Sequence, residues 1–359
     1  MSFIMNIRSV AKYESKILVR SWFFRIFTLL AVVFLGFFNF AMMLMEDNFG
    51  LWFAKSVSSN IPYLNLLLLN TGQAVVAVFL SSEFLKRDKK LDTSEVFYVR
   101  PLSNAEYVVG KIWGNLRVFL FLNLLVLAIV LAFNFMASGV TVDLPAYLVY
   151  FFLISIPTLI FIIGLSIFLM LLLNNQALTF ILLLGYIGLT LFYIQDKFYY
   201  LFDYMVYNLP LFKSTIVGFS NLELILNHRA IYFFAGLGFI FFTIFLFKRL
   251  PNARRSHYPW LFLSFCMFLL MVTAGFRHVR SILWEGEMRA LYTSINNKYV
   301  YEPKMAIDYY DISVEQKSET IRSVVGMEGT ALAASEVFIF CLNPGLRVEA
   351  VSYTHLTLP

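Results

Sequence analysis

The chain has 359 residues, of which 60% are hydrophobic and only 14% are charged, whereas roughly 25% of the residues of an average soluble domain are charged. This composition excludes a water-soluble globule and indicates an integral membrane protein. The net charge of +6 gives no reason to expect nucleic acid as a partner. The two cysteines, Cys266 and Cys341, form no CxxC pair and supply no disulfide framework.

Seven windows of the sequence are apolar and free of Asp, Glu, Lys, Arg and His. A membrane span needs about 20 such residues to cross roughly 30 Å of hydrocarbon, and the windows are close to this length or longer. We therefore predict an all-α polytopic membrane protein with spans at 26–45, 61–82, 118–137, 146–173, 177–195, 230–247 and 259–276.

The basic residues between these windows gather in alternate segments. They are dense before the first window, between the second and third, and between the sixth and seventh, and sparse in the other connections. Because short loops rich in Lys and Arg stay in the cytoplasm, we expect a cytoplasmic N-terminus and an extracytoplasmic C-terminus. The connection 174–176 then forms a tight cytoplasmic hairpin turn.

Residues 1–25 carry basic side chains at a spacing of four, with most apolar side chains elsewhere on the helical wheel; the basic residues are Arg8, Lys12, Lys16 and Arg20. This pattern is typical of an amphipathic helix that lies on the membrane surface. A basic flank that only sets the topology explains the pattern equally well.

The cytoplasmic segment 83–111 is dense in charge of both signs. Just after Pro101, Ser103 is followed three residues later by Glu106, which forms a capping box. This motif predicts a helix that begins near Asn104 and continues without a break into the third span. Such a helix is roughly 50 Å long, so its foot is expected to project below the membrane into the cytoplasm.

Two small residues in this foot, Gly110 and Gly114, form a GxxxG pair. The pair either lets another helix approach closely or has no packing role. Arg117 lies near the inner boundary of the predicted span, where its long side chain is expected to snorkel to the lipid headgroups.

Further predictions concern single residues and the connection after the fifth window. Pro157 in the fourth window predicts a kink. The aromatic segment 196–229 is expected to lie in the outer interface as short helices, acting either as an aromatic anchor or as a substrate gate. No histidine begins an HExxH zinc motif, so His228, His257, His278 and His355 are expected to provide surface or interfacial polarity.

After residue 276 charge returns, and residues 277–349 read as the start of a β-rich extracytoplasmic domain. A helix over 277–292 is expected to leave the membrane, and period-two alternation predicts strands at 306–316 and 336–342. Residues 350–359, which end in VSYTHLTLP, resemble translated read-through of a sequencing adapter. We expect this tail to be an artefact and the native chain to continue past residue 349.

Several chemistries lack their motifs in this sequence. A GxxxxGK[ST] phosphate loop is absent, and no catalytic, cofactor or metal residue is predicted. Because the seven windows hold no titratable side chain, a proton-coupled carrier is disfavoured. Amide side chains remain able to bind a solute, namely Asn39, Asn70, Gln73 and Asn123. Energy is therefore expected from another chain.

These features together resemble the membrane subunit of ABC-2 type ATP-binding cassette transporters. The matching residues stand at the head of the loop (Glu83, Arg87 and Asp88), in its middle (Leu91-Asp92-Thr93-Ser94-Glu95) and at its end (Arg100-Pro101-Leu102-Ser103 and Gly110-Lys111).

The resemblance implies a six-span permease domain over 26–247 in the bacterial cytoplasmic membrane, which works as an exporter and is not itself an enzyme. It also implies a second permease copy or homologue and a separate ATPase subunit that binds the ATP. The residues implied to couple to that ATPase are Glu83, Arg87, Asp88, Leu91, Asp92, Glu95, Arg100, Pro101, Gly110 and Lys111.

The seventh span departs from the six-span pattern. It is similar to a subgroup of bacterial permeases whose extra span exports a C-terminal domain like M1 metallopeptidases, a likeness carried by Leu342-Asn343-Pro344-Gly345-Leu346. An alternative function follows, in which the spans anchor an extracytoplasmic peptidase-like enzyme whose catalytic part is missing. A sensor or scaffold of the same architecture is a third.

Overall fold

The structure is a computed structural model and describes residues 2–44, 57–90, 102–136, 142–194, 196–209, 211, 213–214, 218–219, 221–247, 258–302, 305–317, 320–333, 339–340, 342 and 346–352. Within this part of the chain, seven helical segments are long and apolar enough to cross a membrane: Trp22–Leu44, Asn60–Ser81, Asn104–Met136, Leu144–Leu173, Gln176–Ile194, Leu222–Leu246 and Tyr258–Lys298. They match the seven predicted windows one for one. The chain is therefore a multi-pass membrane protein.

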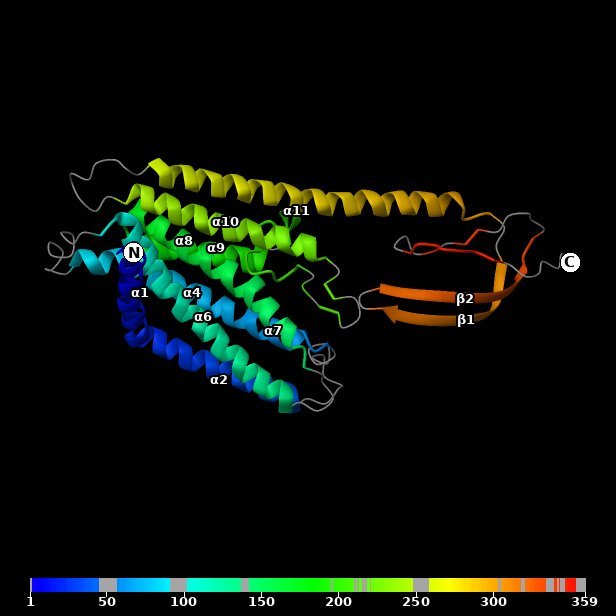
Figure 1. Cartoon of the computed structure of the whole chain (residues 1–359), viewed down its shortest axis with the longest axis horizontal. Helices are drawn as coiled ribbons and strands as arrows, with labels where there is room; N and C mark the ends of the chain where they lie inside the picture. The colour runs from blue at the N-terminus through cyan, green and yellow to red at the C-terminus, as the bar shows by residue number, and fades with distance from the viewer. Residues whose placement is uncertain are drawn as a thin grey trace. The chain divides into compact units, whose positions relative to one another are not determined.

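The first half of the bundle contains α1 (Ser2–Arg20), α2 (Trp22–Leu44), α4 (Asn60–Lys90) and α6 (Asn104–Met136). The predicted capping box at the start of α6 is confirmed, because the Glu106 N–H donates to Ser103 Oγ at 3.2 Å and the Ser103 N–H donates to Glu106 Oε2 at 2.6 Å. Helix α1 lies across one end of the bundle and packs on the first turns of α6 (Figure 1). We call this the α1 end; the starts of α4 and α7 define the far end.

The second half contains α7 (Leu144–Tyr150), a π-helical turn η1 (Phe151–Ser155), α8 (Ile156–Leu173), α9 (Gln176–Leu189), a π-helical turn η2 (Thr190–Ile194), a 3-10 turn η3 (Phe198–Tyr200), α10 (Leu222–Leu246) and α11 (Tyr258–Lys298). The turn η1 ends two residues before Pro157, so the helix is irregular just ahead of this proline; the kink at Pro157 stays a prediction. The hairpin turn between α8 and α9 is confirmed. There Asn174 has a left-handed backbone (φ 50°) and Asn175 Oδ1 accepts the Leu178 N–H at 3.2 Å.

The centre of the bundle is the contact between α8 and α10. A Cβ placed on Gly236 would lie 2.7 Å from the Ile160 backbone, and one on Gly164 would lie 2.6 Å from the Gly236 oxygen. Glycine at both positions therefore lets the two backbones touch, as small residues do between membrane helices. On α8, Ile162 and Ile163 are fully buried beside this contact.

One predicted boundary is wrong. Helix α10 begins at Leu222 and not at residue 230, so His228 and Arg229 belong to the span and not to the preceding connection. The reason is that both side chains bind backbone carbonyls inside the bundle and so need no contact with water. A search for charge-free windows excludes such residues.

The contacts divide the chain into one unit of residues 1–215 and 219–278 and a second unit of residues 216–218 and 279–359. The second unit contains β1 (Met305–Lys317), β2 (Thr320–Ala331) and the end of α11, which confirms the predicted strand 306–316 and helix 277–292. The two strands pair antiparallel, with Ile312 opposite Val325.

The second predicted strand, 336–342, is wrong where the structure describes it, since residues 339, 340 and 342 lie in no strand; the rest of it is outside the described residues. The partner of β1 is instead β2, whose Gly326 and Gly329 weaken the strand pattern in the sequence.

Candidate functional site at the α1 end

The foot of α6 is covered by α1. A Cβ on Gly110 would lie 2.7 Å from Val10 Cβ, and one on Gly114 would lie 2.8 Å from both the Ala11 oxygen and Glu14 Cβ. The GxxxG pair is thus a packing site, and its partner is α1. Without side chains at these two positions, the backbone of α6 can approach α1 closely.

A buried ion pair fastens this contact. Lys111 Nζ lies 3.0 Å from Glu14 Oε1, and the two side chains are only 1% and 4% exposed. Lys111 Nζ also lies 5.0 Å from the centre of the Tyr107 ring, within the range of a cation–π interaction. A charge this well shielded from water is stable only with such partners.

Further hydrogen bonds join α1 to α6. Asn6 Nδ2 donates to Glu106 Oε1 at 2.9 Å, so the carboxylate of the capping box also holds α1. Ser15 Oγ donates to the Gly114 oxygen at 2.6 Å. The Arg117 guanidinium donates to Ser15 Oγ at 2.5 Å and to the Ala11 oxygen at 2.8 Å. The expectation that Arg117 snorkels to headgroups is therefore wrong, because α1 supplies its acceptors.

The ten residues expected to couple to an ATPase fall into three groups. Glu83, Arg87 and Asp88 lie on the last turns of α4. Gly110 and Lys111 lie in the foot of α6, buried against α1. The other five fall outside the described residues: Leu91, Asp92, Glu95, Arg100 and Pro101.

Replacing Gly114 by Val is expected to destabilise the α1–α6 contact by about 1–3 kcal/mol, the usual cost of overpacking. The new side chain would meet the Ala11 backbone and Glu14. Thermal unfolding in detergent and the rate of tryptic cleavage at exposed Lys12 and Lys16 measure the effect. Gly185→Val is the matched control, since a Cβ there has no neighbour within 4 Å; equal effects of the two variants would contradict the packing role.

The sequence did not identify Arg229 as a buried charge of the bundle interior. Its side chain is 2% exposed and donates to the Leu153 oxygen at 2.6 Å, the Tyr204 oxygen at 2.9 Å and Thr158 Oγ1 at 2.8 Å. Pro157 has no N–H, so the carbonyl four residues earlier, that of Leu153, loses its helical partner. Arg229 supplies the missing donor.

The connection 196–209 enters the bundle instead of lying in the interface throughout. Tyr204 is fully buried, with its ring centre 5.9 Å from that of Phe161 and 5.6 Å from that of Tyr186. Such irregular backbone is tolerated within a membrane protein where protein groups satisfy it, and Arg229 does so at the Tyr204 carbonyl. Among the described residues between η2 and α10, the predicted short helices are represented by one turn, η3.

Two histidines expected at the surface are instead fully buried, so this prediction is wrong for them. His228 Nε2 lies 3.0 Å from the Tyr200 oxygen and His278 Nε2 lies 2.9 Å from the Tyr199 oxygen. They thereby hold the turn η3 against α10 and α11. His257 and His355 fall outside the described residues.

Asp203 precedes Tyr204 and is 1% exposed. Burial raises the pKa of its carboxyl, while the backbone N–H groups of residues 206–208 and the charge of Arg229 oppose the rise. The N–H of Asn208 donates to Asp203 Oδ2 at 2.8 Å. A raised pKa means that the folded state holds the proton at pH values where the unfolded chain has lost it.

This carboxyl therefore contributes its full stability below the ordinary pKa of 3.8 and loses it as the pH rises through the raised value. We expect Asp203→Asn to remove that loss while keeping an acceptor for Asn208. As the pH rises from 4 to 8, the unfolding midpoint should fall less for this variant than for the parent. Glu223→Gln, at an exposed side chain, is the control, and parallel profiles for Asp203→Asn and the parent would contradict the assignment.

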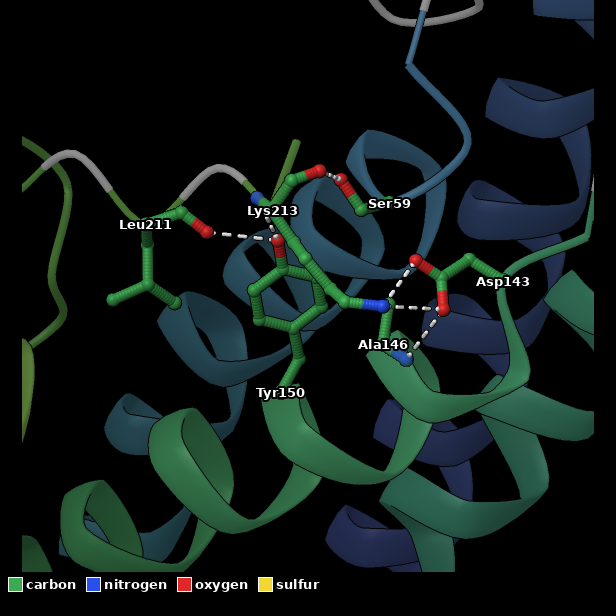
Figure 2. A network of polar contacts seen from close by, with 6 residues as sticks. All are labelled: Ser59, Asp143, Ala146, Tyr150, Leu211 and Lys213. Atoms are coloured by element: carbon green, nitrogen blue, oxygen red, sulfur yellow. Dashed lines mark hydrogen bonds and ion pairs between the residues drawn. The ribbon is translucent and has the colours of Figure 1, made fainter. Parts of the chain in front are cut away.

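A polar network lies at the far end of the bundle (Figure 2). Lys213 Nζ lies 2.6 and 2.9 Å from the two carboxylate oxygens of Asp143. The Lys213 N–H donates to the Tyr150 hydroxyl at 3.2 Å, and that hydroxyl donates to the Leu211 oxygen at 2.7 Å. Ser59 Oγ donates to the Lys213 oxygen at 2.8 Å. The network ties the segment around residue 213 to the starts of α4 and α7.

No protein-family model and no curated protein matches this chain. The site is thus defined by its own geometry: a helix fastened to the foot of α6 at one end, and a segment held in the bundle by Arg229 towards the other.

Proposed function

We propose that this chain is the membrane-spanning permease subunit of an ABC-2 type transporter, an exporter driven by a separate ATPase subunit. The observation that carries the proposal is the fastening of α1 to the foot of α6 by the buried pair Glu14–Lys111. The two helices are joined by an ion pair, by hydrogen bonds and by backbone contact, so they move as one body. In this proposal, a force applied to α1 or to the foot of α6 is transmitted directly to the membrane span of α6.

The location of the charged segment supports the same function. Segment 83–101 joins the last turns of α4 to the capped start of α6. A subunit that binds Glu83, Arg87 and Asp88 on α4, together with the residues that follow them, would act on α4 and α6 at once. In this proposal Gly110 and Lys111 do not touch the ATPase; they transmit its movement to α1.

The remaining parts of the proposal rest on the distribution of charge, which sets the orientation, and on the resemblance to ABC-2 permeases, which implies the membrane, the ATP and the partner subunits. The α1 end, which carries most of the basic residues between spans, faces the cytoplasm of a bacterial inner membrane. ATP binds to the partner ATPase and not to this chain, and a second permease copy or homologue completes the transporter. The far-end network around Lys213 then closes the extracytoplasmic side.

We expect Arg87→Glu combined with Asp88→Lys to reduce the ATPase bound to the purified full chain at least tenfold while leaving membrane insertion intact. The reason is that the pair's charges are reversed at the surface that binds the partner. Vanadate-sensitive ATP hydrolysis that co-purifies with the chain from its native membranes measures the association. The matched control is Glu223→Lys with Arg277→Glu, an exposed pair nearer the far end. Absence of co-purifying hydrolysis from the parent chain would overturn the proposal.

A second candidate is a membrane anchor for an extracytoplasmic peptidase-like enzyme. The hairpin of β1 and β2 beyond α11 favours it, because an isolated two-stranded hairpin is marginally stable in water and one face here carries exposed Tyr310, Ile312 and Val325. Sequencing the genomic locus separates the candidates. A neighbouring Walker A ATPase gene favours the permease, whereas an HExxH motif downstream of residue 349 without such a neighbour favours the enzyme.

A further inference from the structure

An amide cluster lies in the bundle interior, where α4, α6 and η1 meet. Its members are Asn70, Gln73, Asn123 and Ser155, each at most 1% exposed. Asn123 Oδ1 accepts from Ser155 Oγ at 2.8 Å and from Asn70 Nδ2 at 3.1 Å, and Asn123 Nδ2 donates to Gln73 Oε1 at 2.8 Å. Asn123 is therefore the centre of the cluster, with the two α4 amides on either side.

The hydrogen bonds fix the orientation of these amides. Asn70 Nδ2 also donates to the Leu66 oxygen at 2.8 Å, so the reversed amide would bring two oxygens together. Asn123 Nδ2 donates to Gln73 Oε1. If the Gln73 amide were reversed, its nitrogen would face Asn123 Nδ2, and two donors would meet. Both reversals pair like groups, so the pattern determines which atom of each amide remains free.

Two of these atoms lack a partner among the residues that the structure describes. They are Asn70 Oδ1, an acceptor, and Gln73 Nε2, a donor, and both are buried. Buried polar atoms rarely stay unpaired, because they have given up their bonds to water. The pair Asn39–Asn65, also at α4, shows the contrast. There each Nδ2 donates to the other residue's Oδ1, at 2.7 and 3.1 Å, so the two amides satisfy each other.

The two free atoms are complementary and close along the helix. Asn70 and Gln73 lie three residues apart on α4, a rise of about 4.5 Å, and both bind the same Asn123. A hydroxyl group can donate its hydrogen to Asn70 Oδ1 and accept one from Gln73 Nε2, so one such group supplies the partner that each atom lacks. A charged group does not suit the cluster, since its members carry no charge to balance one.

We infer that Asn70 Oδ1 and Gln73 Nε2 form a binding site for one hydroxyl group in the interior of the bundle. The hydroxyl belongs either to a bound water molecule or to a hydroxyl-bearing molecule that the bundle carries. The second source rests on the proposed function, whereas the first does not.

The test is a density map of the full chain in lipid nanodiscs at a resolution that shows ordered water. We expect density within hydrogen-bond distance of both atoms. A single isolated peak identifies water. Extended density, together with a hydroxyl-bearing compound in the organic extract of the purified chain, identifies a carried molecule. Absence of density there, or partners for both atoms from the chain itself, would overturn the inference.

A variant and a control complete the experiment. Gln73→Leu should lose the density, and with it any compound that co-purifies, because the donor is gone. Asn65→Leu should keep both, since it removes an amide of the same helix that is already satisfied. If Gln73→Leu does not fold, the map of the parent chain still decides. Neither measurement uses ATP or an ATPase, so failure here is distinct from failure of the proposed function.

Discussion

Replacing Lys111 by Met should destabilise the folded chain by about 3–5 kcal/mol. Removing one member of a buried ion pair takes from the other charge the partner that offsets its burial, and here the carboxylate of Glu14, which is 4% exposed, would lose Lys111. The loss should be visible as a lower unfolding midpoint in detergent and as faster proteolysis within α1.

The double variant Glu14→Leu/Lys111→Met should recover most of the lost stability, since it removes both charges of the pair together. Lys16→Met on the exposed face of α1 is the control and should change stability by less than about 0.5 kcal/mol. If the double variant is as unstable as Lys111→Met, the pair is not the source of the effect. If the double variant is stable but the proposed transporter that contains it is no longer driven by ATP hydrolysis, the ion pair transmits movement between α6 and α1 and does not only stabilise the fold.

Replacing Arg229 by Met should destabilise the chain by at least about 2 kcal/mol, because several buried acceptors lose their donor at once. The Leu153 carbonyl loses the guanidinium that replaces the missing N–H of Pro157. The Tyr204 carbonyl loses its hydrogen bond from Arg229, which fixes this part of the connection in the bundle. We expect lower expression, a lower unfolding midpoint and cleavage of the connection 196–209 by added protease.

The role of Pro157 makes this prediction separable from a general loss of packing. In a Pro157→Ala background the restored N–H can pair with a carbonyl of the preceding turn. Arg229→Met should therefore lower the free energy of unfolding by less in this background than in the parent. The double-mutant cycle measures this coupling. Arg277→Met, at a guanidinium 69% exposed, should have little effect. Equal costs of Arg229→Met in both backgrounds would show that the Leu153 carbonyl does not need this donor.

The sequence was sufficient to predict the spans, because hydropathy and length dominate in a chain of this composition. The capping box at Ser103, the turn at Asn174 and the strand 306–316 were also predictable, since each depends on a few neighbouring residues. The start of α10 was not. His228 and Arg229 are acceptable in a span only because Tyr200, Tyr204 and Leu153 offer carbonyls to them, and these partners lie 25 to 76 residues away.

The candidate site divides in the same way. Glycine spacing in the foot of α6 indicated a contact but could not identify α1 as its partner, about 100 residues earlier in the chain. Glu14 gave no signal, because a single acidic residue in a basic amphipathic helix looks solvent-exposed. The sequence indicated that Asn39, Asn70, Gln73 and Asn123 are able to bind a solute. Only their mutual geometry separates the satisfied pair Asn39–Asn65 from the unsatisfied atoms of Asn70 and Gln73.

The position of Arg229 also constrains how the protein is made. A guanidinium in a nascent span is costly for the insertion machinery, and its acceptors here belong to α7–α8 and to the connection before α10. All of these are synthesised earlier and are already in or at the bilayer when α10 emerges. Insertion of α10 thus depends on α7–α8 and on the connection before α10. Deletion of α8 should therefore leave α10 outside the membrane, although the sequence of α10 is unchanged.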